Sequence, residues 1–153
     1  AQASYSMAFF LFRALEEAGV YRLAFGLWDR WRTMVDLNLT TWAEDPNGSR
    51  SDCHAWGAAP LYEFPRVVLG IKPELPGFAG IEVQPFPGPL TYAEGSMATP
   101  RGLVRVRFDR TGDRLAVEVD GPAGVPLTLR LPDGTVKAFE SAAAVRETVM
   151  VSN

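Results

Sequence analysis

The apolar residues of this chain change their spacing near residue 72, and this change limits the possible folds more than any other feature. Before it, they recur every three or four residues, which predicts helices that bury one face. After it, they alternate with polar residues in short runs, which predicts half-buried strands. We therefore expect an α+β protein with segregated elements, helical over residues 1–72 and a β-sheet domain over residues 73–153.

The first two predicted helices are separated by a single glycine. One follows an apolar face from Tyr5 to Leu15, and Gly19 suits the left-handed position that ends a helix. The next runs from Val20 to Val35 with apolar residues at i, i+3, i+4 and i+7. So short a connection predicts an antiparallel pair of helices.

A third helix is expected after the polar, turn-rich stretch of residues 36–51. Its N-cap would be Ser51 or Asp52, and Gly70 would stop it after Leu69. Two prolines interrupt it, so we expect a kink or two short helices. These are Pro60 and Pro65.

The second half of the chain predicts an antiparallel β-sandwich. Residues 72–78 carry two prolines and a glycine and are expected to form a linker. Short alternating strands with frequent turns are typical of sandwiches. The alternating runs are 81–83, 104–108, 115–119 and 127–131, with turns expected at Thr111-Gly112-Asp113 and Pro132-Asp133-Gly134.

The predicted helices are apolar on more than one side. Phe9 and Phe10 are adjacent and therefore point in different directions. Helices with two apolar faces belong inside a larger assembly. We expect the helical part to pack on a partner that this chain lacks, or to self-associate.

Composition excludes several classes of protein. With 47% apolar and 22% charged residues, the chain is that of a globular protein. A net charge of -3 predicts binding neither to nucleic acid nor to an anionic membrane surface. It has no apolar run long enough to span a bilayer, and its first residues lack the signal-peptide pattern.

Cys53 is the only cysteine, which excludes an intramolecular disulfide. No second Cys or His forms a zinc pattern with it, so neither a metal nor an organic cofactor is expected. The compartment stays open among cytoplasm, periplasm and secretion.

Residues 40–60 collect the side chains that sugar sites need. Carboxylates move protons, aromatic rings cover the C–H face of a pyranose, and Arg, His and Asp bond hydroxyls. Each also has an ordinary interpretation: a solvated surface acid, a structural histidine or a core tryptophan. The candidates are Trp42, Glu44, Arg50, His54 and Trp56.

An ordered series of motifs resembles the end of the catalytic domain of bacterial α-L-rhamnosidases. It begins with Thr-Thr-Trp-Ala-Glu at residues 40–44 and Ser-Arg-Ser-Asp-Cys-His-Ala-Trp-Gly-Ala-Ala-Pro at residues 49–60. The resemblance covers about residues 1 to 120. Its later segments are 61–63, 68–73, 76–78, 81–85, 93–96 and 99–102.

The resemblance implies an inverting glycosidase that acts on a rhamnose-containing glycoside or polysaccharide. Residues 1–72 would be the last helices of an (α/α)6 barrel, and residues 73–153 its C-terminal β-sandwich. Glu44 would be the general base, His54 would contact the sugar, and Trp42, Arg50 and Trp56 would line the pocket. The general acid would lie upstream, so the chain alone is expected to be inactive.

Other interpretations stay open from the sequence. Another six-hairpin glycosidase, such as an α-L-fucosidase, is one, and a complete small protein of unrelated function is another. A non-catalytic module would either bind carbohydrate or support a barrel. Support fits better, because Phe108 and Phe139 are the only aromatic residues after residue 92. Glu94 is expected at a strand end or turn, where it could help to dock the sandwich.

Overall fold

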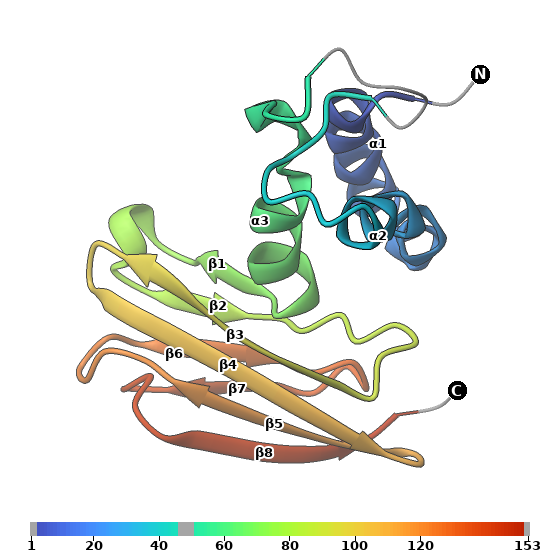
Figure 1. The fold of residues 1–153 in the computed structure, drawn as a ribbon. Helices are drawn as coiled ribbons and strands as arrows, with labels where there is room; N and C mark the ends of the chain where they lie inside the picture. Colours follow the sequence, from blue (N-terminus) through green and yellow to red (C-terminus); the bar gives the residue numbers. More distant parts are fainter. Residues whose placement is uncertain (1–2, 46–50, 152–153) are drawn as a thin grey trace. The chain divides into compact units, whose positions relative to one another are not determined.

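The structure is a computed structural model that describes residues 3–45 and 51–151. It divides into two compact units, Ala1–Glu63 and Phe64–Asn153. The first contains α-helices and the second contains two β-sheets (Figure 1), so the segregated α+β class is confirmed. The division between Glu63 and Phe64 falls earlier in the chain than the change in periodicity at residue 72.

The first helix forms as the sequence predicts. Helix α1 spans Tyr5–Glu17, and the Ser4 hydroxyl at its N-cap accepts the Met7 N–H at 3.3 Å. Gly19 takes a φ of 68°, and the Val20 N–H donates to the Leu15 carbonyl at 2.9 Å. This is the glycine-dependent helix end that the sequence indicates.

The predicted helix from Val20 to Val35 is wrong as a single element. A 3-10 helix, η1 (Tyr21–Leu27), precedes α2 (Asp29–Asp36). Gly26 lowers helix propensity at this point. Trp28 lies at the junction of the two elements, and its ring stacks on that of Phe12 with centroids 4.2 Å apart.

The third helical segment is interrupted, as its prolines predict. It consists of η2 (Ala55–Gly57), α3 (Ala59–Glu63) and, in the second unit, the π-helix η3 (Phe64–Val68). The N-cap prediction is wrong, because the Ser51 hydroxyl accepts the Cys53 N–H at 3.1 Å in a local turn before η2. No helix within residues 3–45 and 51–151 is long and apolar enough to cross a bilayer.

The second unit is a β-sandwich with sheet orders β1-β2-β6-β7 and β3-β4-β5-β8 (Figure 1). Alternate residues of the central strands fill the space between the sheets, with side chains such as Phe108 and Leu129 fully buried. The strands are β1 (Ile71–Pro73), β2 (Ile81–Val83), β3 (Tyr92–Thr99), β4 (Gly102–Thr111), β5 (Arg114–Asp120), β6 (Leu127–Arg130), β7 (Val136–Phe139) and β8 (Val145–Met150), with a 3-10 turn η4 (Pro76–Phe78) after β1.

The four alternating runs and both turns are confirmed, and three details differ. The expected linker of residues 72–78 contains the end of β1 and the turn η4, so it belongs to the sandwich. Strand β2 pairs with β6 in parallel, because the chain crosses to the other sheet for β3 to β5 before it returns. Strands β3, β7 and β8 lack a clear apolar alternation, so the sequence does not predict them.

Glu94 lies inside β3, opposite Arg107 of β4, and not at a strand end or turn. Its neighbours Ala93 and Gly95 are small, so this strand shows little apolar signal in the sequence. Pairing with β4 therefore determines the position of Glu94 in the sheet.

Candidate functional site

Two segments of the helical unit that carry the predicted sugar-site residues lie side by side. The His54 N–H donates to the Trp42 carbonyl at 2.6 Å, and the Glu44 N–H donates to the Ser51 carbonyl at 2.9 Å. The Thr41 hydroxyl donates to the Asp52 carbonyl. The first two bonds run between backbones, so they hold the two loop segments together whichever side chains the segments carry.

Side chains of α2 contact this pair of segments and hold it in place. The Ala43 N–H contacts the Met34 sulfur at 3.5 Å, and the Trp31 indole donates to the Gly57 carbonyl at 2.8 Å. A Cβ at Gly57 would stand 2.5 Å from the Ala43 carbonyl oxygen, so only glycine allows this approach. Buried helix residues thereby fix the loop that carries Trp42, Glu44 and His54.

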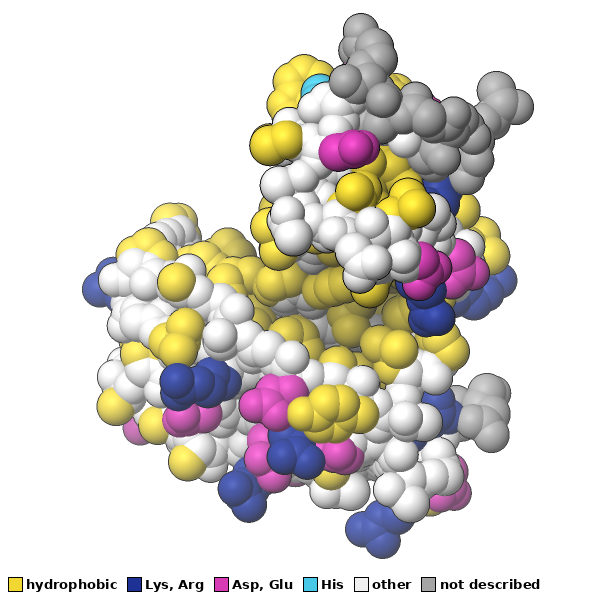
Figure 2. All heavy atoms as spheres, in the orientation of Figure 1, with side chains coloured by type: hydrophobic (Ala, Val, Ile, Leu, Met, Phe, Trp, Pro, Cys, Tyr) yellow, Lys and Arg dark blue, Asp and Glu magenta, His cyan; other side chains and the backbone are white. Residues whose placement is uncertain are grey.

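The candidate side chains differ in exposure. Trp42, Glu44 and His54 are half-buried, whereas Trp56 is 74% exposed. The rings of His54 and Trp56 meet edge to face, with centroids 5.9 Å apart. In Figure 2 the histidine lies at the surface next to hydrophobic side chains. Arg50 lies outside the described residues, and the roles of all five side chains stay predictions.

The described residues offer no metal centre. Within residues 3–45 and 51–151, no group of three His, Cys, Asp or Glu side chains could hold a metal ion. The chemistry available from these segments is that of a carboxylate, an imidazole and indole rings.

An apolar groove of about 400 Å³ lies beside this loop, between α1 and the segment from η2 to α3. Trp56 belongs to both the groove and the predicted sugar site. Ala55, Ala58 and Ala59 keep the groove open on the η2 and α3 side. Its large side chains are Met7, Phe9, Phe10, Trp56 and Tyr62.

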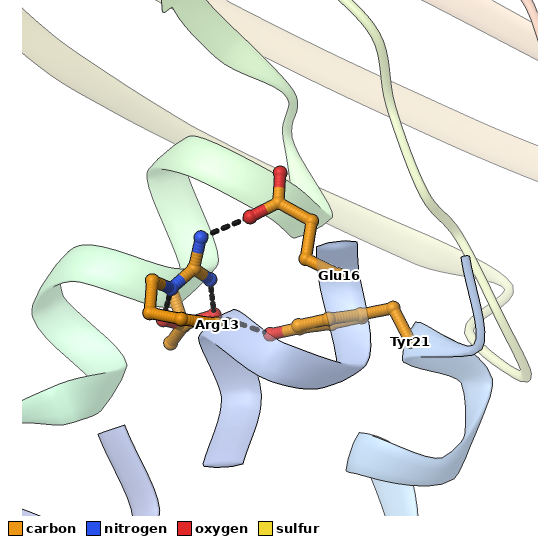
Figure 3. A network of polar contacts seen from close by, with 4 residues as sticks. Arg13, Glu16 and Tyr21 are labelled. Atoms are coloured by element: carbon orange, nitrogen blue, oxygen red, sulfur yellow. Dashed lines mark hydrogen bonds and ion pairs between the residues drawn. The ribbon is translucent and has the colours of Figure 1, made fainter. Parts of the chain in front are cut away.

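The helical unit also contains a buried carboxylate. Glu63 is fully buried, and its carboxylate accepts the Arg13 Nε–H at 2.9 Å and the Tyr21 hydroxyl at 2.8 Å. A second Arg13 nitrogen also pairs with Glu63, and the third bonds Glu16. In Figure 3 the side chains of Glu16 and Tyr21 both point toward the Arg13 guanidinium.

The network shifts the pKa values of both Arg13 and Tyr21 upward. Burial lowers the pKa of Arg13, but the hydrogen bond and charge of Glu63 outweigh it and leave that pKa above its ordinary value. Burial raises the pKa of Tyr21 most, and the hydrogen bond to Glu63 raises it further. Arg13 therefore stays a cation and Tyr21 a neutral donor to the carboxylate.

The same network supports the groove. The Arg13 guanidinium lies 5.1 Å from the Tyr62 ring centroid and 5.9 Å from that of Phe9. Sequence reasoning missed this role of Glu63, because its arginine partner is 50 residues away. No local pattern marks such a pair.

The comparisons with known proteins agree on one family. Residues 70–146 match the model of the bacterial alpha-L-rhamnosidase C-terminal domain, and the chain belongs to this family. An alpha-L-rhamnosidase of Alteromonas sp. (strain LOR) is 34% identical over 129 residues, which cover 72% of this chain.

Solved rhamnosidases share the fold. The GH78 family rhamnosidase of Bacillus sp. GL1 is 30% identical and matches with a TM-score of 0.77 over 86% of this chain and 15% of its own. The alpha-L-rhamnosidase of Aspergillus terreus matches at 0.82 with 20% identity, over 91% of this chain and 18% of its own. The Streptomyces avermitilis enzyme, solved with L-rhamnose, matches at 0.77 with 20% identity, over 91% of this chain and 17% of its own.

The chain spans only a small part of these relatives. It corresponds to 14% of the Alteromonas protein and to less than a fifth of each solved structure.

Proposed function

We propose that this chain is the C-terminal part of an α-L-rhamnosidase that removes terminal α-L-rhamnosyl residues from glycosides with inversion at the anomeric carbon. Residues 1–72 contain the last helices of its (α/α)6 catalytic barrel, and residues 73–153 belong to its C-terminal sandwich domain. Membership of the rhamnosidase C-terminal family and the rhamnose complex of a relative with the same fold support this substrate class.

Glu44 is the general base that takes a proton from the attacking water. His54, Trp42, Arg50 and Trp56 contact or enclose the sugar. The observation that carries this assignment is the pair of backbone hydrogen bonds, Glu44 to Ser51 and His54 to Trp42, which brings a carboxylate, an imidazole and indole rings onto adjoining loop segments. A half-buried carboxylate suits a base that must reach both water and substrate.

The chain by itself hydrolyses nothing. Inversion requires an acid on one side of the bond and a base with its water on the other, roughly 6.5–9.5 Å apart. Asp45 is adjacent to Glu44 in sequence and does not provide the opposite side. The general acid belongs to upstream segments of the parent protein.

The same upstream segments cover the helical unit. Phe10, Trp56 and Leu61 are more than 60% exposed, an unusual state for side chains of this size. Relatives several times longer than this chain support intramolecular cover, with self-association as the other outcome.

The test measures the parent protein on an aryl α-L-rhamnoside. Glu44→Gln should reduce kcat by about 10²-fold or more, since general base catalysis contributes about 10²–10⁴-fold. NMR of the first product should show the β-anomer. Asp45→Asn is the matched control, and its kcat should change little.

Three outcomes would contradict the proposal. One is full activity of Glu44→Gln, and another is turnover by the isolated 153-residue chain. Preference of the parent for an aryl α-L-fucoside would assign a different sugar.

A further inference from the structure

A shallow depression of about 350 Å³ lies on the outer face of the sandwich, far along the chain from the Glu44 loop. Strand β3 supplies four of the residues that line it, and β4 supplies the other. Figure 2 shows acidic and basic side chains interspersed on the face of this unit that is turned to the viewer. The lining residues are Tyr92, Glu94, Gly95, Ser96 and Arg105.

The aromatic ring and the carboxylate of this depression are held in place although they are exposed. The Tyr92 hydroxyl donates to Glu94 Oε2 at 2.7 Å. The Arg107 guanidinium lies 5.4 Å from the Tyr92 ring centroid and its Nε donates to Asp109 at 2.7 Å. These three successive contacts reduce the side-chain freedom that a ligand would otherwise have to restrict.

Arg105 keeps donors for a ligand. Its closest acid is Asp120, at 3.9 Å from Nη1, which is longer than a hydrogen bond. A guanidinium has five N–H donors, and the Arg105 side chain is 61% exposed, so a ligand can reach them. Ser96 stands opposite Arg105 in the β3–β4 register.

We propose that this depression binds a neutral, hydroxyl-rich ligand of the size of one pyranose ring. The Tyr92 ring, 49% exposed, covers the C–H face of the sugar. Glu94 accepts a hydrogen bond from one hydroxyl and Arg105 donates to its neighbour. The two opposite charges balance, which favours a neutral ligand, and the volume is within the range of small-molecule sites.

The 153-residue chain is titrated with L-rhamnose and with D-glucose while its backbone amide resonances are followed by NMR. We expect shifts at residues 92–96 and 105 with a dissociation constant in the millimolar range. Arg105→Ala should weaken binding about tenfold, as expected when a charged donor is lost. Tyr92→Ala should abolish it.

Arg146→Ala is the matched control, because Arg146 lies on the same sheet with an exposed pairing to Glu118 at 3.6 Å. It should bind as the unchanged chain does, and circular dichroism should show that all variants stay folded. The proposal is overturned if neither sugar shifts these resonances or if Arg105→Ala binds as tightly as the control. Shifts confined to residues 42–56 overturn it too, but they leave the proposed rhamnosidase function standing.

Discussion

The carboxylate of Glu63 and the guanidinium of Arg13 form an ion pair whose acidic partner has no exposed surface. Glu63 is the last residue of α3, and Arg13 lies in α1. With Tyr21 of η1 as a third partner, the pair joins three helical segments of the first unit. These segments are too short to be stable alone, so such cross-links matter.

Loss of one partner should therefore destabilise the helical unit strongly. Glu63→Ala leaves the Arg13 charge without its buried partner, and we expect a loss of about 3–5 kcal/mol in the free energy of unfolding. Urea denaturation followed by tryptophan fluorescence measures this loss, since all the tryptophans lie in the first unit.

Glu17→Ala is the control. Glu17 lies at the exposed end of α1, and its substitution should change stability by less than about 0.5 kcal/mol. Equal effects of the two substitutions would show that the ion pair adds nothing.

Tyr21 should make the stability of the unit fall at alkaline pH. Burial and the bond to Glu63 raise the pKa of Tyr21 above its ordinary value near 10. The unfolded chain releases this proton above about pH 10, whereas the folded chain retains it, so stability decreases as pH rises through that range. The stabilisation is fully present below about pH 10.

Comparison with Tyr21→Phe isolates this proton. At neutral pH the variant should be less stable by about 1.5–3 kcal/mol, because a hydrogen bond to a charged group is lost. Above pH 10 this difference should shrink by up to about 1.4 kcal/mol per pH unit. The other tyrosines are present in both proteins and cancel. A difference that is constant with pH would contradict the prediction.

Much of the fold follows from local patterns in the sequence. Strands β4 and β5 alternate because both pack one face on the core, and Gly112 and Gly134 take the positive φ that their turns require. The end of α1 at Gly19 follows from the same backbone rule.

Long-range packing explains what the sequence could not predict. The break between η1 and α2 falls at Trp28, whose ring stacks on that of Phe12 only once the chain has folded. Strand β3 needs its pairing to β4, because Gly95 and Ser96 indicate no strand by themselves. Likewise, the Glu63 network joins residues that no local spacing connects.

The candidate site shows the same limit. Motif resemblance selected Glu44, His54 and the tryptophans, but the backbone bonds that join their segments are visible only in the structure. Spacing alone left each of these side chains with an ordinary structural interpretation.

Gly70 should be irreplaceable at the start of the sandwich. Its φ is 78°, and a Cβ there would stand 2.1 Å from the carbonyl carbon and oxygen of Gln84. The pairing of β1 with β2 begins at the next residues, Ile71 and Val83. We expect Gly70→Ala to lose at least about 3 kcal/mol, from backbone strain and from the clash together.

Thermal denaturation followed by circular dichroism of the strands measures this loss. Gly112→Ala is the control, because its φ of 61° imposes strain but nothing lies within 4 Å of the added carbon. It should lose only about 1–2 kcal/mol. If the two variants melt alike, the contact with Gln84 has no energetic role.

Gly57 should control the loop that carries the candidate base. A Cβ at Gly57 would lie 2.5 Å from the Ala43 carbonyl oxygen, so Gly57→Ala must push the Trp42–Glu44 segment away from its partner. We expect faster hydrogen exchange at the Glu44 and His54 amides and a loss of about 1–3 kcal/mol in stability, the usual cost of overpacking.

Gly26→Ala is the control, since nothing lies within 4 Å of its added carbon. It should leave both amides unchanged and should be neutral or stabilising by up to about 1 kcal/mol. Unchanged exchange in Gly57→Ala would mean that this close approach does not hold the two loop segments together.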